Sequence, residues 1–138
     1  MKITNDFTIL CKETLFDNSK STISIMGVLE GAEVQELPTG ISDLQVVTRF
    51  TVEDSGDFNN REVSFKVKRP DGTSVSITQD DDKEKYTIDF KPNTDRQKTG
   101  LIIDLMLSLT VVGIYFFEVY IDGRKVGSQD LLVRLAES

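Results

Sequence analysis

The residues of this sequence that could do chemistry are chiefly carboxylates in its polar segments. Asp54 and Asp57 lie in one such segment, and Asp80 and Asp82 lie in another. In an antiparallel sandwich successive connections alternate between the two ends, so we expect both segments at the same end. Carboxylates gathered there could hold calcium, which takes oxygen ligands at about 2.3–2.6 Å. The Asp54-x-x-Asp57 spacing differs from the EF-hand pattern, so solvated loop charge is the simpler interpretation and a calcium-dependent, lectin-like site is the alternative.

Several other chemistries are excluded by residue types that are missing or single. Histidine is absent from the 138 residues, which removes the commonest general base and metal ligand. Cys11 is the only cysteine, so neither an intrachain disulfide nor a thiolate zinc site can form. Because Phe7, Ile9 and Cys11 alternate, we expect Cys11 to be a small core side chain. Nothing in the sequence would desolvate one carboxylate of a pair, so we expect no enzyme, no catalytic residues and no cofactor apart from the calcium alternative.

The charge of the chain limits the classes of partner. A net charge of −7 argues against nucleic acid and anionic membranes, because both attract Lys and Arg. The first residues also lack the apolar stretch of a signal peptide. The apolar run 101–121 is interrupted by Asp104 and Glu118, and its uncharged part is shorter than the about 20 residues that a membrane helix needs. We therefore expect two strands there, in a cytoplasmic protein that binds neither nucleic acid nor membrane.

The clearest structural signal is Gly113–Gly123, a β-branched and aromatic run that an Asp-Gly turn closes. A second alternating run follows at once, which predicts a hairpin. Similar runs recur about every 8–14 residues, and helical periodicity is short throughout. We predict one all-β domain over residues 1–138, an antiparallel β-sandwich of about eight or nine strands, immunoglobulin-like or jelly-roll-like. The predicted strands are 7–11, 21–28, 43–52, 62–68, 74–78, 86–90, 101–109, 113–121 and 125–135.

The segments between these strands are predicted to be irregular. Residues 12–20 are polar and indicate a loop, and residues 31–42 are acidic and contain Pro38 and Gly40, which favours a long loop or a short helical turn. One end of the sandwich is expected to carry basic residues mixed with acidic ones. Mixed charge usually serves solubility, and a site for an anion or an acidic partner is the alternative. The basic residues of that end are Arg69, Lys91, Arg96, Lys98, Arg124 and Lys125.

The strongest functional signal is an excess of apolar side chains on strand faces that should be polar. In strand 113–121 the odd-numbered positions 115 to 121 are predicted to be core, yet the even-numbered positions are also largely apolar. Either another segment covers this surface within the monomer, such as a helix, residues 31–42 or the N-terminal segment, or the surface is an interface. We predict a protein-interaction module that self-associates or binds a partner protein through one face of strands 101–109 and 113–121. The predicted interface residues are Ile102, Met106, Ile114, Phe116 and Tyr120.

One pattern of turns, strand ends and core positions is spread over most of the chain. Its residues are Cys11, Ser24-Ile25-Met26-Gly27-Val28, Pro38, Pro70-Asp71-Gly72, Gly113, Tyr115, Phe117, Asp122 and Gly123. This pattern resembles a bacterial or phage family of small all-β sandwich proteins of unknown function. The resemblance implies the fold and no catalytic residues. One departure is Val112, because the family has a proline before the glycine. A phage or mobile-element factor that binds a host protein is thus a further form of the interaction hypothesis.

Overall fold

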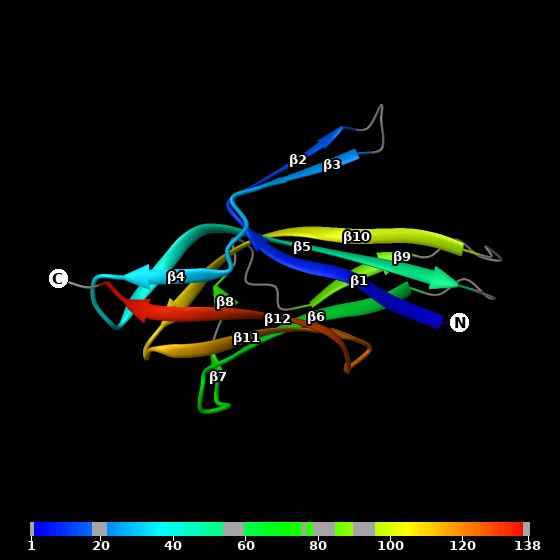
Figure 1. The fold of residues 1–138 in the computed structure, drawn as a ribbon. Helices are drawn as coiled ribbons and strands as arrows, with labels where there is room; N and C mark the ends of the chain where they lie inside the picture. The colour runs from blue at the N-terminus through cyan, green and yellow to red at the C-terminus, as the bar shows by residue number, and fades with distance from the viewer. Residues whose placement is uncertain are drawn as a thin grey trace.

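The structure of the protein is a computed structural model that describes residues 2–17, 22–53, 60–75, 77–78, 85–89 and 96–136. Every regular element within these residues is a β-strand, so the all-β prediction is confirmed (Figure 1). No helix in this part of the chain is long and apolar enough to cross a membrane. The strands are β1 (Lys2–Cys11), β2 (Glu13–Asp17), β3 (Thr22–Met26), β4 (Gly31–Val34), β5 (Thr39–Glu53), β6 (Asn60–Lys68), β7 (Ser74–Val75), β8 (Ile77–Thr78), β9 (Lys85–Asp89), β10 (Arg96–Leu109), β11 (Gly113–Ile121) and β12 (Arg124–Leu135).

Two sheets face each other, and a separate hairpin stands away from one of them (Figure 1). The four-stranded sheet has the order β1-β5-β10-β8, and the six-stranded sheet has the order β4-β12-β11-β6-β7, with β9 also paired to β6. Strands β2 and β3 form the hairpin. The described residues thus form twelve strands rather than the eight or nine predicted. Strand β4 runs parallel to β12, so the pairing is not antiparallel throughout.

The core lies between the two facing sheets and takes the inward side chains of both. Tyr115 is the largest of its fully buried residues. The Tyr115 hydroxyl accepts hydrogen bonds from the backbone N–H groups of Thr110 and Val111 at 3.1 and 3.0 Å, and donates one to the carbonyl of Val111 at 2.8 Å. It therefore holds the β10–β11 turn against the core. The core residues predicted for β11 are confirmed: Tyr115, Phe117, Val119 and Ile121.

Two short strands lie where the sequence predicts irregular structure. Residues 13–17 form β2, which pairs with β3, and residues 31–34 form β4, which adds to the edge of the six-stranded sheet. Both predictions of a loop are wrong for one reason. Each segment is short and becomes a strand because another strand supplies its backbone hydrogen bonds: β3 pairs with residues 13–17, and β12 pairs with residues 31–34.

The turns form as their residue types predict. Asp122 and Gly123 have φ angles of 50° and 80°, which suits a two-residue hairpin turn and confirms the predicted β11–β12 hairpin. Gly113 has a φ of 129°, and a Cβ at this position would collide with the side chain of Pro70. Only glycine therefore fits at the start of β11.

The chain does not alternate regularly between the two ends, so the predicted grouping of connections by end is wrong. Strands β7 and β9 are both antiparallel to β6 and hence run in the same direction. The turn at Arg69 lies beside the β10–β11 connection, where Arg69 Nε donates to Thr110 Oγ1 at 3.1 Å. Arg124 lies beyond the other end of β11, opposite Ile121. Arg69 and Arg124, predicted to share one end, therefore lie at opposite ends.

Candidate functional site

The predicted interface residues do not share one face. Strand β10 belongs to the four-stranded sheet and β11 to the six-stranded sheet, because the chain crosses between sheets at residues 110–112. Ile102 and Met106 thus lie on the outer face of the four-stranded sheet. Ile114, Phe116 and Tyr120 lie on the outer face of the six-stranded sheet. The prediction of a single continuous surface is wrong. The side chains of Ile102 and Ile114 are nevertheless exposed to almost the same extent, 45% and 44%.

Tyr120 belongs to a charged cluster rather than to an apolar surface. Its hydroxyl donates to Glu118 Oε1 at 2.9 Å, and Lys66 Nζ lies 4.8 Å from the centre of its ring. Glu118 also forms ion pairs with Lys68 at 3.2 Å and Lys125 at 2.9 Å. The side chains of this Glu118 cluster come from β6, β11 and β12 and cover the middle of the outer face of the six-stranded sheet.

Glu118 is ionised within this cluster although only 5% of the residue is exposed. Burial is the largest influence on its carboxyl and by itself raises the pKa. Hydrogen bonds from the two lysines and the tyrosine together outweigh burial and hold the pKa of Glu118 below its ordinary value. Burial, followed by the hydrogen bond to Glu118, raises the pKa of Tyr120. The cluster therefore gathers one carboxylate and two ammonium groups in ion pairs, which makes this area polar.

The outer face of the four-stranded sheet has the opposite character. Ile9, Val47 and Ile102 lie side by side across β1, β5 and β10, and Phe7 precedes this row beside Arg49. Val47 is only 2% exposed, although it lies outside the core between the sheets. Ile102 is predicted from the sequence to be an apolar residue outside the core. In the structure Phe7, Ile9 and Val47 form one apolar row with it.

Cys11 also lies on this outer face, outside the core cluster between the sheets, although its burial agrees with the prediction of a small core side chain. The register pairs Cys11 with Gln45, whereas the core takes Leu10 and Leu44. Cys11 is nonetheless fully buried, and its Sγ lies 3.6 Å from Thr14 Oγ1 at the start of β2. Alternation defines two faces of a strand but not which face is turned to the core.

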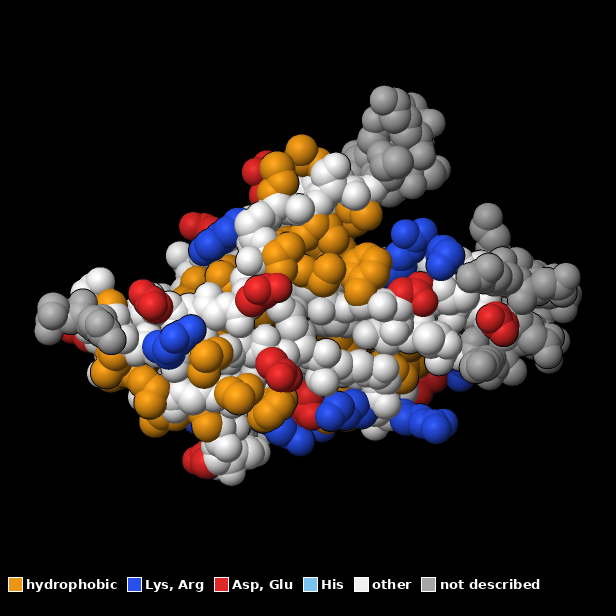
Figure 2. All heavy atoms as spheres, viewed as in Figure 1, with side chains coloured by type: hydrophobic (Ala, Val, Ile, Leu, Met, Phe, Trp, Pro, Cys, Tyr) orange, Lys and Arg blue, Asp and Glu red, His pale blue; other side chains and the backbone are white. Residues whose placement is uncertain are grey.

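The hairpin β2–β3 stands over this face and forms a groove with it (Figure 2). The groove encloses about 430 Å³, and the figure shows hydrophobic side chains gathered between the hairpin and the sheet. Gly100 lies in its floor, where β10 and β5 approach so closely that a Cβ would collide with the backbone of Thr48. The hairpin groove is lined by Phe7, Ile23, Val47, Thr48, Arg49, Lys98, Thr99, Gly100, Leu101 and Ile102.

Two cations border the hairpin groove. Lys98 Nζ donates to Thr51 Oγ1 at 3.1 Å and forms an ion pair with Asp6 at 3.5 Å. The half-buried Arg49 makes no side-chain hydrogen bond or ion pair within the described part of the chain. The groove therefore combines an apolar floor with one guanidinium group that has no acceptor among the residues that the structure describes.

A second apolar area lies on the six-stranded sheet, beyond the Glu118 cluster. Ile114 and Leu132 are directly opposite each other on β11 and β12, and Phe116 and Val112 adjoin them. All four are exposed, and this β11–β12 patch has no overhanging hairpin. It therefore offers a ligand fewer enclosing contacts than the hairpin groove does.

The predicted calcium ligands Asp54, Asp57, Asp80 and Asp82 lie outside the described residues. Among the residues that are described, no group of three or more acidic, cysteine or histidine side chains could hold a metal ion. Calcium binding remains a prediction.

Sequence reasoning missed Phe7, Val47 and Arg49 as site residues. The signal was present in consecutive apolar residues, such as Val46 and Val47, since a strand that is apolar on both faces is covered on both. Arg49 carries no comparable signal, because an isolated arginine in a strand is ordinary surface charge.

Comparisons with known proteins add a family but no activity. A family model described as "Family of unknown function (DUF6941)" matches residues 6–134. None of the curated proteins matches the sequence. A crystal structure of an immunoglobulin-like protein from Pseudomonas aeruginosa is similar, with 14% sequence identity, coverage of 97% of this chain and 98% of that chain, and a TM-score of 0.33.

Proposed function

Because the chain belongs to the family of unknown function DUF6941, whose description names no activity, we propose a function from its outer faces. The protein is a non-enzymatic interaction module that holds a segment of a partner protein in the hairpin groove. The segment carries apolar side chains followed by an Asp or Glu. We further propose that the two sheets act as an immunoglobulin-like sandwich scaffold and that the module works in the cytoplasm.

The observation that carries this proposal is the chemistry of the groove. Its floor exposes apolar side chains, of which Ile102 is the most open, in a space of about 430 Å³. A water-filled apolar groove favours an apolar occupant, because the occupant removes that surface from water. The other two areas described on the outer faces do not combine an apolar floor with an overhanging hairpin. The Glu118 cluster is charged, and the hairpin does not stand over the β11–β12 patch.

Charge complementarity indicates which occupant fits. Arg49 borders the apolar floor without an acceptor in the described residues, and a guanidinium group pairs best with a carboxylate. An acidic side chain of the partner would complete that pair. A second copy of this chain is less favoured as the occupant, because two molecules of net charge −7 repel each other.

The contacts available also limit the affinity. Ile102 and the half-buried side chains beside it would each recover only part of the roughly 1.5–3 kcal/mol that full burial gives. A charge-assisted hydrogen bond adds about 1.5–3 kcal/mol. After the cost of association, we expect an isolated peptide to bind with a micromolar or weaker Kd.

A displayed library of random linear peptides, selected on the immobilised protein, tests the proposal. We expect enrichment of peptides that combine apolar residues with Asp or Glu, and fluorescence anisotropy then measures the affinity of selected peptides. Ile102→Glu should weaken binding at least about tenfold, because it places a like charge on the groove floor. Arg49→Ala should weaken binding of the acidic peptides alone.

The matched control is Ile114→Glu, an identical substitution at a position of equal exposure on the other sheet. It should leave peptide binding unchanged. The proposal is wrong if no peptides are enriched, if basic peptides are enriched instead, or if both substitutions reduce binding equally. Light scattering completes the test, because a dimer that Ile102→Glu dissociates would make a second copy the occupant and overturn the proposed partner.

A further inference from the structure

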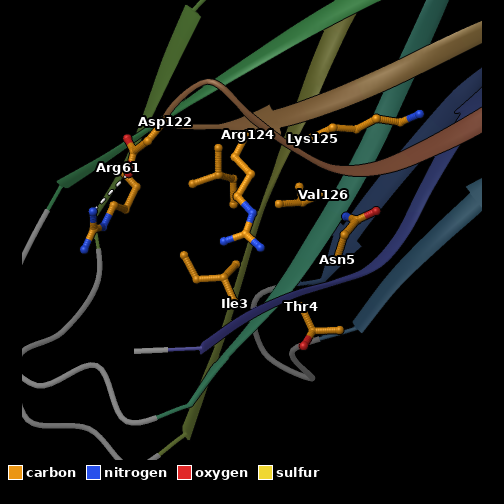
Figure 3. Close-up of a pocket in the computed structure, with 9 residues that line it drawn as sticks. Ile3, Thr4, Asn5, Arg61, Asp122, Arg124, Lys125 and Val126 are labelled. Carbon is orange, nitrogen blue, oxygen red and sulfur yellow. Dashed lines mark hydrogen bonds and ion pairs between the residues drawn. The ribbon is translucent and has the colours of Figure 1, made fainter.

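A second recess lies at one end of the molecule, away from the hairpin groove. Here the beginning of β1 meets the turn between β11 and β12 and the first residues of β6 (Figure 3). This end cleft has a volume of about 820 Å³, within the roughly 300–1,000 Å³ of small-molecule sites. Its apolar side chains are Ile3, Ile121 and Val126, which belong to both sheets.

Arg124 is directed into the end cleft by the register of the hairpin. It lies directly opposite Ile121, and directly opposed residues of an antiparallel pair point to the same side of a sheet. Ile121 is buried and faces the core, so the side chain of Arg124 also projects from the inner face of the six-stranded sheet. Figure 3 shows its guanidinium group reaching across the cleft toward Ile3 on the other sheet.

The other charged residues of the end cleft each have an ion-pair partner, although the buried Nε of Arg61 has no hydrogen-bond partner among the described residues. Arg61 Nη1 donates to Asp122 Oδ2 at 3.0 Å, and the backbone N–H of Glu62 donates to Asp122 Oδ1 at 3.1 Å. Lys125 leaves the cleft, as Figure 3 shows, and its ammonium pairs with Glu118 at 2.9 Å. Within the described residues, the Arg124 side chain has no hydrogen bond or ion pair.

Neutral polar groups at the border do not replace Arg124. The Asn5 amide nitrogen donates to the carbonyls of Phe7 and Arg49 and to Thr48 Oγ1, and the Asn5 oxygen accepts from Thr8. Both N–H groups of the Asn5 amide are thus used within the protein, so Asn5 has none to donate to an anion. Among the described residues, Arg124 is thus the one guanidinium group of the cleft without an ion pair, and it lies above an apolar surface in a protein whose net charge is −7.

We propose that the end cleft binds a small organic anion in which an oxyanion head, carboxylate or phosphate monoester, is attached to an apolar body. The planar guanidinium of Arg124 pairs with the head through two parallel hydrogen bonds, a geometry that both oxyanions accept. The apolar body lies against Ile3, Ile121 and Val126 and is thereby removed from water. This site is independent of the hairpin groove and of the partner proposed for it.

Titration of the full chain with four probes tests the inference, with binding followed by NMR amide shifts. The probes are octanoate, octyl phosphate, inorganic phosphate and octylammonium, all kept below micelle-forming concentrations. We expect octanoate, octyl phosphate or both to shift the amides of residues 3–5 and 121–126 in a saturable way. Binding by octanoate alone identifies a carboxylate ligand, and binding by octyl phosphate alone identifies a phosphate ester.

Arg124→Gln should raise the Kd of the binding probe at least about tenfold, because a charge-assisted pair is lost. The control Arg134→Gln removes the same charge from the same strand, on the outer face of the sheet, and should leave the Kd unchanged. The inference is overturned if octylammonium binds as well as octanoate, if inorganic phosphate binds as well as octyl phosphate, if Arg124→Gln has no effect, or if no probe binds.

Discussion

The central strands of the two sheets bury their outer faces in different ways. Val47 in β5 and Glu118 in β11 both point away from the core, and both are almost fully buried, with 2% and 5% exposure. Val47 is covered by apolar neighbours and an overhanging hairpin, whereas Glu118 is covered by lysine and tyrosine side chains that pair with it. Low exposure therefore reports two different environments.

This difference bears on function. A charged cluster satisfies its own groups, so it needs no further occupant. The apolar face depends on cover, and the two-stranded hairpin covers it only in part, leaving a groove with exposed apolar residues. An isolated two-stranded hairpin is only marginally stable, so its packing on the sheet and an occupant of the groove would stabilise each other.

Of the substitutions considered, a charge introduced at Val47 should reduce the stability of the protein most. Val47→Asp places a carboxylate without a partner beneath the hairpin, and we expect it to lower the free energy of unfolding by roughly 3 kcal/mol or more. Ile114→Asp, on the open β11–β12 patch, should cost less than about 1 kcal/mol. Urea denaturation measures both. Equal losses would show that the outer faces do not differ in cover.

Replacement of Glu118 tests the charged cluster. Because the folded pKa of Glu118 lies below its ordinary value, ionisation stabilises the fold above the unfolded pKa of about 4.3, and this contribution is lost as the pH falls through the folded pKa. Glu118→Gln should therefore cost about 1–3 kcal/mol at pH 7. The difference from wild type should shrink as the pH falls below 4.

Denaturation curves of both proteins at several pH values check this prediction. The variant should lose less stability than wild type on acidification, because it has no carboxylate to protonate at this position. A difference between the two proteins that stays constant from pH 7 to pH 3 would show that Glu118 acts by packing alone.

The smallest expected effect is on the local opening of the β2–β3 hairpin. The rate at which a thiol reagent modifies Cys11 measures this opening. The thiol is fully buried beside Thr14, whose strand partner is Ile25. Ile25→Asp should loosen the hairpin and raise the rate of Cys11 modification by a thiol reagent about tenfold, or ~1.4 kcal/mol of opening free energy. Ile114→Asp should leave the rate unchanged. An unaltered rate in Ile25→Asp would mean that the hairpin does not protect Cys11.

The strands that alternate cleanly could be predicted well, and the candidate site only in part. Strand β11, its inward residues and the Asp122-Gly123 turn appear as predicted, since these features depend on neighbouring residues. Ile102 and Ile114 are exposed, but on opposite faces of the molecule. Their separation depends on the sheet that each strand joins, and that choice is made by distant partners.

Local features could be predicted from the amino-acid sequence: the strand periods, the turn types, and the exclusion of histidine and disulfide chemistry. Which face of each strand meets the core depends on the tertiary structure. Phe7, Ile9 and Cys11 alternate as core residues of a strand would. Their side chains nevertheless lie on the outer face of the four-stranded sheet, because Leu44 and Val46 of β5 point inward beside Leu10. An alternating pattern has a period of two whichever face of the strand is turned to the core. The face that is buried is therefore selected only by the pairing of strands from distant parts of the chain.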